Sequence, residues 1–255
     1  MKTNRSKSID SFFVDIAKKV GKKILYYKKN NLIKIEKKQN NLKTNIDITA
    51  NKIWVSEIKK KFFDIDILSE ELRIKPKIKN DWNGFIIDPI DGTKSLYSGH
   101  ISYVTQGAYV KRGEIISSII YNPETQENFI NSSKYLKKSN NLNSIIDNYP
   151  KPNSSLIKII KRLEIPNYIE AGSIGYKISK VLDGTSDLFI KLNTIKIWDV
   201  APGLFLIKQN GGIITDKYFR EISFNKLDIK GLIVTMNKKN LTFIKKKYPK
   251  GLVSL

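Results

Sequence analysis

A short apolar run followed at once by two acids and a glycine most constrains how this chain can fold. Phe85-Ile86-Ile87 leads directly into Asp88-Pro89-Ile90-Asp91-Gly92-Thr93-Lys94. An apolar run of this length predicts a short buried strand, from Gly84 to Asp88, and the residues from Gly92 to Leu96 predict a turn into a helix. Asp88 would then stand at the carboxyl end of a strand, where open α/β sheets bind their ligands.

The two acids of this motif predict a cation site. Pro89 fixes φ and supplies no N–H, and Gly92 permits a tight turn, so we expect Asp91 to fold back beside Asp88. Carboxylates held so close repel each other unless a cation lies between them, and Mg²⁺ prefers such hard oxygen ligands. The N–H groups at the following helix start can hold a phosphate. For the motif alone, an ordinary strand, Asp-Gly turn and helix cap is the competing interpretation.

Periodicity predicts helices and strands along the whole chain. Apolar residues recur at helical spacing in residues 9 to 26 and from Asp47 to Phe62. The first of these predicted helices is basic and amphipathic, and such a helix packs on its own domain or lies on a membrane surface. Runs 103–110, 114–121 and the residues up to Ile130 predict an antiparallel meander. The second half alternates helices, at 174–182 and 199–209, with strands at 188–190, 212–215 and 231–235. These elements predict an α/β, or layered α+β, fold.

Composition sets limits on organisation and partners. The 255 residues contain no cysteine, and a polar stretch from Asn131 to Ser155 suggests two halves, 1–140 and 141–255. A net charge of +22, from 46 basic and 24 acidic residues, would attract nucleic acid, anionic lipid or a phosphorylated small molecule. Lysine scattered among abundant Ile and Asn is also what an AT-rich coding sequence produces. No apolar run approaches the roughly 20 residues that span a bilayer, so a soluble cytoplasmic protein is expected.

Two further acidic positions extend the motif. Ser69-Glu70-Glu71 ends an apolar run before Asp88, and Trp198-Asp199 opens a predicted helix. Taken singly, Glu70 is typical of a solvated surface acid and Asp199 of a helix N-cap. Taken together with Asp88 and Asp91, they supply the distant carboxylates that a metal site needs.

The order of these motifs resembles the Mg²⁺-dependent, lithium-sensitive phosphatases of the inositol monophosphatase superfamily, which include 3′(2′),5′-bisphosphate nucleotidase. The resemblance spans roughly residues 44 to 235. The motifs that carry it are Thr44-Asn45-Ile46-Asp47, Ser69-Glu70-Glu71, Asp88 to Thr93, Gly172-Ser173 with Lys177, Gly184-Thr185-Ser186-Asp187, Trp198 to Gly203, and Asn210-Gly211-Gly212. It implies a sugar-phosphatase-like fold of alternating helix and sheet layers.

The resemblance also implies roles for individual residues. Glu70, Asp88 and the Ile90 carbonyl would hold one Mg²⁺, and Asp88, Asp91 and Asp199 a second, so two or more ions are expected and Li⁺ should inhibit. Asp47 and Thr93 would be catalytic, orienting the attacking water through their hydrogen bond. The phosphate-binding and substrate-binding positions would be Gly92, Thr93, Lys94, Ser173 and Asp199.

Three positions tilt the expected substrate towards a bisphosphate nucleotide such as 3′-phosphoadenosine 5′-phosphate. Lys94 and Ser69 are nearer to the nucleotidase pattern, and Leu192 stands where inositol monophosphatases tend to carry Glu. An inositol monophosphatase or a broader sugar phosphatase is the alternative, and a basic binding protein without turnover is the rival from another class. The expected partner is a small phosphate ester, with no specific nucleic acid and no membrane span, and homodimers are compatible with the resemblance.

One departure from the family pattern lies next to Asp199. Pro202 replaces the commoner Ala of the Trp-Asp motif. With a helix beginning at Asp199, Pro202 falls in the first turn, where proline is tolerated because no intrahelical N–H is needed there.

Overall fold

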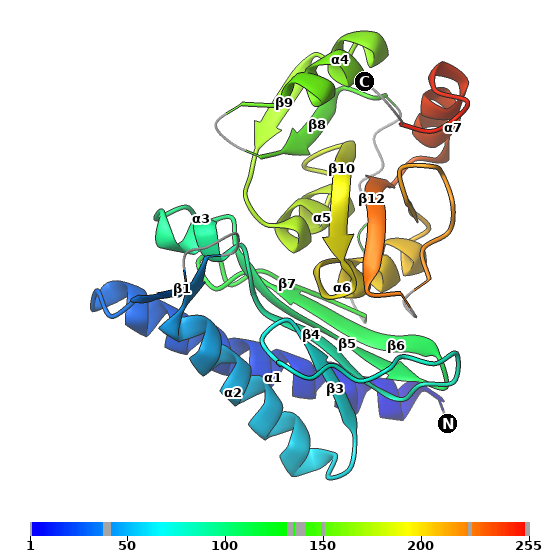
Figure 1. Cartoon of the computed structure of the whole chain (residues 1–255). Coiled ribbons are helices and arrows are strands. Elements are labelled where there is room, and N and C mark those ends of the chain that lie inside the picture. Colours follow the sequence, from blue (N-terminus) through cyan, green and yellow to red (C-terminus); the bar gives the residue numbers. More distant parts are fainter. Residues whose placement is uncertain are drawn as a thin grey trace. The chain divides into compact units, whose positions relative to one another are not determined.

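The structure, a computed structural model, describes residues 2–37, 42–131, 135, 141–148, 151–223 and 226–252 (Figure 1). The chain forms two compact units. The first comprises Met1–Ser133, Ser173–Tyr176 and Trp198–Phe205, and the second comprises Lys134–Gly172, Lys177–Ile197 and Leu206–Leu255. Two short segments from beyond residue 140 therefore belong to the first unit, so the units are not consecutive halves of the sequence.

A five-stranded sheet organises the first unit, in the order β3-β4-β5-β6-β7. Its strands are β3 (Asp66–Ser69), β4 (Gly84–Asp91), β5 (Val104–Lys111), β6 (Glu114–Tyr121) and β7 (Asn128–Ile130). β3 runs parallel to β4, and all the other neighbours are antiparallel. The meander predicted from the alternating runs is confirmed. Smaller elements of this unit are β1 (Ile35–Lys37), β2 (Lys43–Thr44) and α3 (Thr93–Tyr97).

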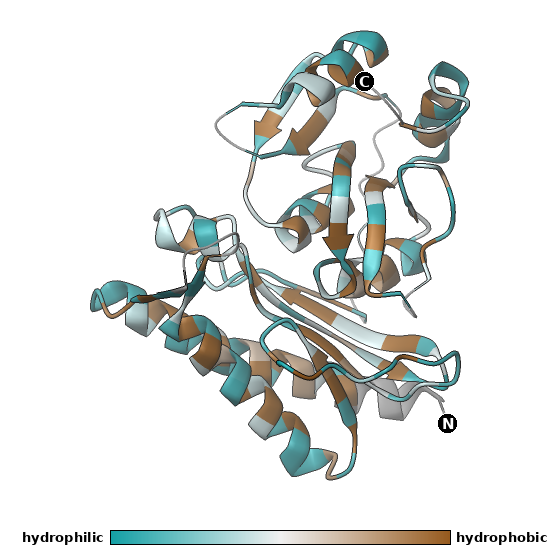
Figure 2. Cartoon of the chain, viewed as in Figure 1, coloured by the Kyte–Doolittle hydropathy of each residue, from teal (hydrophilic) through white to brown (hydrophobic). Residues whose placement is uncertain are grey.

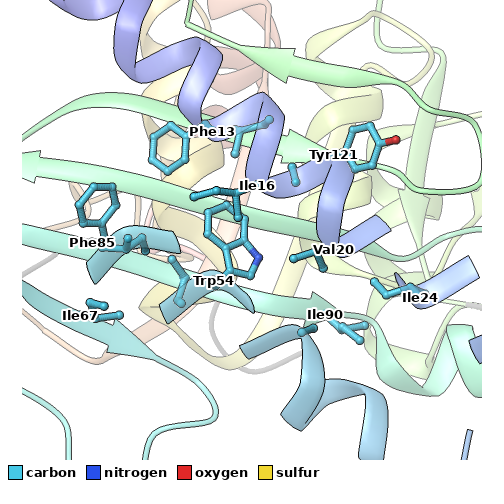
Figure 3. Packing of buried hydrophobic residues seen from close by; sticks show 14 of the residues in the cluster. Phe13, Ile16, Val20, Ile24, Trp54, Ile67, Phe85, Ile90 and Tyr121 are labelled. Carbon is cyan, nitrogen blue, oxygen red and sulfur yellow. The ribbon is translucent and has the colours of Figure 1, made fainter. Parts of the chain in front are cut away.

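Two amphipathic helices, α1 (Lys2–Lys29) and α2 (Asn45–Lys61), pack on one face of this sheet. Apolar and polar residues alternate around both helices in Figure 2, as packing on a domain requires. The shared core joins Phe13 of α1, Trp54 of α2 and Phe85 of β4 (Figure 3). α1 is therefore a packed helix of its own domain. In α2 the buried face includes Asp47 beside the apolar residues, whereas Ile48 is only half-buried.

The opposite face of the sheet receives the start of helix α6 (Ile197–Gln209). Neighbouring residues of β6 show the two faces: Ser117 Oγ donates to Asp10 Oδ1 of α1 at 2.7 Å, and Ser118 Oγ donates to the Pro202 carbonyl at 3.0 Å. The expectation that Pro202 lies in the first turn is wrong, because α6 begins two residues earlier than predicted. Pro202 is inside the helix and removes an N–H that the helix would use.

The second unit has its own five-stranded sheet and core. The strand order is β11-β12-β10-β8-β9, comprising β8 (Ser144–Asp147), β9 (Asn167–Glu170), β10 (Leu188–Lys196), β11 (Ile213–Thr215) and β12 (Asp228–Thr235). Helices α4 (Ser154–Leu163) and α7 (Lys238–Lys247) contribute to its core, and α5 (Ile174–Leu182) lies where the periodicity predicted it. β8 lies inside the polar stretch interpreted as a boundary. Mixed layers of helix and sheet confirm the predicted fold class.

Candidate active site

Three acids of the candidate site, Glu70, Asp88 and Asp91, lie at one edge of the first sheet because of strand direction and register. β3 and β4 are parallel, with Ser69 opposite Ile87, so Glu70 follows at the same edge as Asp88. Between β4 and β5 the pairing shifts, with Asp88 opposite Gln106 but Asp91 opposite Val104. Residues three apart in a regular strand point to opposite faces of the sheet. A bulge adds one residue to the strand between them, so that both side chains can point to the same face. The two acids thus come together through a bulge within β4, not through the tight turn we expected between them.

Asp88 is the most deeply buried of these acids. Its side chain is almost fully buried, Oδ1 accepts a hydrogen bond from Ile90 N at 3.1 Å, and no donor in the described chain reaches the buried Oδ2. Burial, followed by the charges of Glu70, Asp91 and Asp199, holds the pKa of Asp88 well above its usual value. A buried acceptor without a donor is costly, so this oxygen is suited to receive a ligand.

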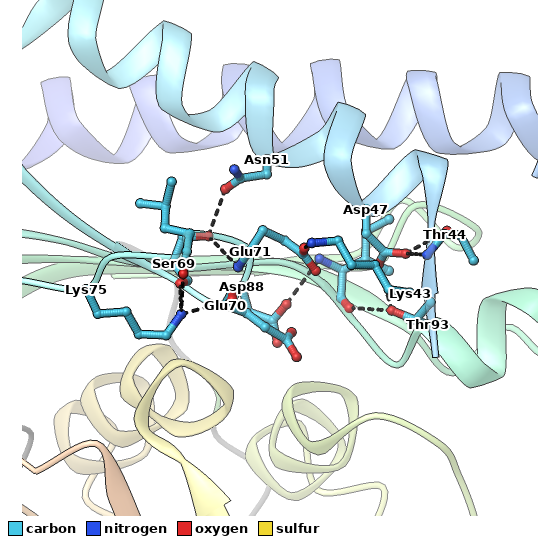
Figure 4. Close-up of polar contacts among 12 residues, drawn as sticks. Lys43, Thr44, Asp47, Asn51, Ser69, Glu70, Glu71, Lys75, Asp88 and Thr93 are labelled. Atoms are coloured by element: carbon cyan, nitrogen blue, oxygen red, sulfur yellow. Dashed lines mark hydrogen bonds and ion pairs between the residues drawn. The ribbon is translucent and has the colours of Figure 1, made fainter. Parts of the chain in front are cut away.

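Glu70 lies beside Asp88 and shares its electrostatic environment (Figure 4). Burial and the charges of Glu71 and Asp91 raise the pKa of Glu70 to about 7, and a hydrogen bond with the Asp88 carboxyl works in the opposite direction. Burial and the neighbouring carboxylates thus disfavour the ionised form of Glu70, and a cation bound beside it would remove that penalty.

Asp91 is held by the beginning of α5. Its Oδ2 accepts hydrogen bonds from Ser173 Oγ, at 2.8 Å, and from Gly175 N, and its Oδ1 accepts from Ile174 N at 3.3 Å. Backbone N–H groups at a helix start favour a negative charge, which stabilises the ionised carboxylate. Ser173 is expected to bind phosphate, but in this structure its hydroxyl donates a hydrogen bond to Asp91.

Asp47 and Thr93 form a second, adjoining group. Thr93 Oγ1 donates to Asp47 Oδ1 at 2.7 Å, so the expected hydrogen bond between these residues is present. Asp47 Oδ2 accepts from Thr44 N at 2.7 Å and from Thr44 Oγ1 at 2.6 Å, which closes the first turn of α2. Burial is the main cause of the raised pKa of Asp47. Asp47 is thereby fixed as an acceptor aimed at the Thr93 hydroxyl.

The backbone after Asp91 makes a turn that only glycine adopts readily. Gly92 has φ +97°, and a Cβ at this position would lie 2.8 Å from Ser173 Cβ. α3 begins immediately afterwards, with Thr93 half-buried and Lys94 exposed. The N–H groups of the first residues of a helix have no intrahelical acceptor, so this turn can present them to an anion. The side chain of Ile90 lies in the core, and only its backbone reaches the site: the N–H donates to Asp88 Oδ1, and the carbonyl is the group that could bind a cation.

Lys75 supports the site and was not identified from the sequence. Its Nζ donates to the carbonyls of Ser69, Glu70 and Leu72 at 2.7, 3.0 and 2.9 Å, and lies 4.5 Å from the centre of the Trp198 ring. It therefore ties the segment that carries Glu70 to the residue before Asp199. In a chain with so many lysines, nothing in the pattern distinguishes this one.

Two motif residues of the second unit have structural partners there. Lys177 is fully buried, and its Nζ contacts Asp147 Oδ1 at 3.2 Å and the Asn148 side chain. Asp187 Oδ2 accepts hydrogen bonds from the backbone N and Oγ of Ser144, both at 2.9 Å. These contacts fix the two ends of β8.

The four acids Glu70, Asp88, Asp91 and Asp199 offer only carboxylate oxygen, which fits a hard divalent ion such as Mg²⁺. Within the described residues, no three acidic, His or Cys side chains are already gathered as a metal-binding group. Asp91 is turned towards the start of α5, where it accepts hydrogen bonds from Ile174 N and Gly175 N. The donorless Oδ2 of Asp88 is nevertheless an oxygen that a cation would satisfy, so these residues fit the ion.

The pKa of Glu70 predicts how pH changes stability. Without metal, the folded protein should lose stability as pH rises from about 4.5 to about 7, because unfolded Glu70 releases its proton first. The shift corresponds to roughly 3 kcal/mol. Mg²⁺ should therefore raise the melting temperature more at pH 8 than at pH 5. Thermal unfolding with EDTA or Mg²⁺ across this range measures both trends, and equal Mg²⁺ stabilisation at the two pH values would contradict the expectation.

A layered α+β fold with Glu70, Asp88 and Asp91 at one edge of its first sheet fits the class of metal-dependent phosphatases. A model of the inositol monophosphatase family matches residues 6–247, and the chain belongs to that family. The resemblance seen in the sequence is thus confirmed, and the chain is a phosphoric monoester hydrolase. No helix in the described residues has the length and apolar character needed to cross a membrane.

Curated relatives carry different names. The chain is 29% identical over 224 residues to a fructose-1,6-bisphosphatase/inositol-1-monophosphatase from Thermotoga maritima, covering 80% of this chain and 83% of the relative. It is 27% identical over 215 residues to the Nus factor SuhB of Xylella fastidiosa, covering 77% and 76%. It is 22% identical over 220 residues to the 3′(2′),5′-bisphosphate nucleotidase CysQ of Haemophilus influenzae, covering 79% and 81%.

Solved structures share the fold. An IMPase from Thermotoga maritima superposes with a TM-score of 0.77 at 26% identity, covering 94% of this chain and 96% of that one. An IMPase/NADP phosphatase, solved with Mg²⁺ and phosphate, superposes with a TM-score of 0.80 at 19% identity, covering 94% and 95%.

Proposed function

We propose that this protein is a Mg²⁺-dependent phosphomonoesterase that removes the 3′(2′)-phosphate from 3′(2′)-phosphoadenosine 5′-phosphate. The observation that carries the metal dependence is the buried Asp88, whose Oδ2 has no donor in the described chain and whose neighbours are acids. Glu70, Asp88 and the Ile90 carbonyl would hold one ion, and Asp88, Asp91 and Asp199 another. When bound, the ions neutralise phosphate charge, lower the pKa of a water and stabilise the leaving oxygen.

Asp47 and Thr93 would position and deprotonate the attacking water. Thr93 Oγ1 donates a hydrogen bond to Asp47 at 2.7 Å, with the Ile90 carbonyl at 3.3 Å, so its lone pairs remain to accept a hydrogen bond from water. As the water oxygen attacks phosphorus, its proton can pass to Thr93 Oγ1 while the Thr93 proton passes to Asp47. The pKa of Asp47 is raised by burial, which favours taking up that proton. The ester bond to the leaving alcohol breaks, the alkoxide oxygen takes a proton from solvent water, and Asp47 returns its proton to the solvent, so that the protons balance.

The turn at Gly92 would orient the phosphate. The N–H groups of Gly92 and Thr93 would donate to phosphate oxygens, and the exposed Lys94 would contribute a positive charge. Ser173 would influence the bound phosphate indirectly, because its hydroxyl donates a hydrogen bond to Asp91 and so orients that carboxylate. Positioning and charge neutralisation are what phosphoryl transfer requires from a protein.

The choice of a bisphosphate nucleotide rests on three positions. Lys94 can pair with a second phosphate, Ser69 precedes the acids as in nucleotidases, and Leu192 offers no carboxylate for sugar hydroxyls. Leu192 is half-buried against the core of the second unit. The Thermotoga maritima relative, at 29% identity, supports the alternative of an inositol or sugar phosphatase.

A phosphate-ester panel tests the substrate. Phosphate release from 3′-phosphoadenosine 5′-phosphate, inositol 1-phosphate and fructose 1,6-bisphosphate would be compared with Mg²⁺, with and without Li⁺. We expect kcat/KM to favour the nucleotide by about tenfold or more, since one added ion pair of about 1.4 kcal/mol gives that ratio. Lys94→Thr should reduce the preference, and Li⁺ should inhibit every reaction.

The outcomes of the panel separate the three readings. Preference for the inositol ester would reject the nucleotide and leave the metal chemistry intact. A basic binding protein, the alternative that the net charge of +22 supports, would hydrolyse no ester. It would show salt-sensitive binding to nucleic acid that survives Asp91→Asn.

A further inference from the structure

The helix that carries Asp199 lacks one of its own hydrogen bonds. In an α-helix the N–H of residue i+4 donates to the carbonyl of residue i, so residue 202 should serve the carbonyl of Trp198. Pro202 has no N–H, and it lies inside α6 (Ile197–Gln209). The carbonyl immediately before Asp199 therefore needs a donor from elsewhere.

Gln106 of β5 supplies that donor. Its Nε2 lies 3.2 Å from the Trp198 carbonyl and 3.2 Å from the Asp199 carbonyl, and it lies 3.5 Å from Oδ2 of Asp91. The side chain is fully buried and pairs across the sheet with Asp88. One amide group thus reaches the backbone around Asp199 and the carboxylate of Asp91.

The orientation of the Gln106 amide, and the energetic cost of burying its unbonded oxygen, indicate a specific role for its N–H groups. Oε1 of Gln106 is buried and has no donor in the described chain, which is unfavourable for stability. Reversing the amide would aim Oε1 at two carbonyls and a carboxylate, so the acceptors dictate the orientation. An apolar residue of equal volume would fill the space without leaving Oε1 unsatisfied. The N–H groups are therefore the reason for a polar side chain here.

We propose that Gln106 is a positioning residue for the cation site: it replaces the N–H that Pro202 lacks and so holds the first turns of α6, with Asp199, against Asp91 and Asp88. Its effect on cation binding rests on the proposed function, whereas the compensation of Pro202 does not. Gln106 and Pro202 should consequently be energetically coupled, although they are far apart in sequence.

A double-mutant cycle tests this coupling on the whole protein. Gln106→Met keeps the side-chain volume and removes the donor, and Pro202→Ala restores the helical N–H. We expect Gln106→Met to raise the Mg²⁺ concentration for half-maximal thermal stabilisation about tenfold, or about 1.4 kcal/mol. Pro202→Ala alone should change it little, and the double variant should recover most of the loss. An equal loss in both backgrounds, or no loss, would overturn the proposal.

Stability measurements keep the test independent of the proposed function. In urea unfolding without metal, Pro202→Ala should lessen the destabilisation caused by Gln106→Met, and if the single variant fails to fold, the double variant should fold. Absence of this rescue overturns the proposal even if Mg²⁺ does not bind. Ser118→Ala is the matched control, because its hydrogen bond to the Pro202 carbonyl replaces no missing N–H, so Pro202→Ala should not rescue it. Absence of phosphatase activity in the wild-type protein would contradict the proposed function but not the coupling between Gln106 and Pro202.

Discussion

Replacing Asp88 with Asn is expected to abolish phosphate release while raising the stability of the metal-free protein. Asn keeps the shape of the side chain but removes the charge that burial, Glu70, Asp91 and Asp199 all disfavour. Loss of a charged cation ligand should lower kcat by roughly 10³-fold or more. This effect is larger than that of removing one hydrogen bond to the transition state. The relief of repulsion should raise the melting temperature by about 2 to 4 °C for each kcal/mol gained.

Thermal unfolding in EDTA at pH 8, beside phosphate release with saturating Mg²⁺, measures both effects. Asp81→Asn is the matched control, because Asp81 is exposed and removal of its charge should change neither quantity. Mg²⁺ should stabilise the wild type and the control but have little effect on the Asp88 variant. An unchanged or lower melting temperature for Asp88→Asn in EDTA would show that its charge is compensated in some other way.

Removing the Thr93 hydroxyl should give the second large effect. Thr93→Ala is expected to lower kcat by about 10²- to 10³-fold, the usual contribution of a positioned acid–base group. The concentration of Mg²⁺ needed for half-maximal activity should change little, because Thr93 Oγ1 donates mainly to Asp47, at 2.7 Å, and lies 3.3 Å from the Ile90 carbonyl, the one expected Mg²⁺ ligand that it contacts. Thr93→Ser keeps the hydroxyl and should retain most of the activity.

Asp47→Asn provides the complementary measurement. Because the two residues act through one hydrogen bond, the double variant should be hardly slower than either single variant. Steady-state rates at saturating Mg²⁺ for the four proteins give the comparison. Multiplied losses in the double variant, or full activity of Thr93→Ala, would mean that another group positions the water.

Much of the local structure is predictable because it depends on neighbours in sequence. The meander from β5 to β7 and helix α5 follow from alternation and helical spacing. α4, β9 and α7 are not among the predicted elements, although Leu156, Ile159 and Leu163 of α4 stand at helical spacing behind the N-cap Asn153. Their structure depends on packing within the second unit, which no local window contains.

The sequence by itself determined the kind of chemistry that this protein can perform. The order of Asp47, Glu70, Asp88, Asp91, Thr93 and Asp199, with a glycine at the turn, was enough to identify the family. Only the tertiary structure decided how these residues come together: by a bulge in β4, by Lys75 bonded to the Glu70 carbonyl, and by Gln106 bonded to the Trp198 carbonyl. The reason is that a hydrogen-bond donor and its acceptor must be close in space but not in sequence. A pair such as Gln106 and Trp198, which are 92 residues apart, therefore leaves no local sequence pattern.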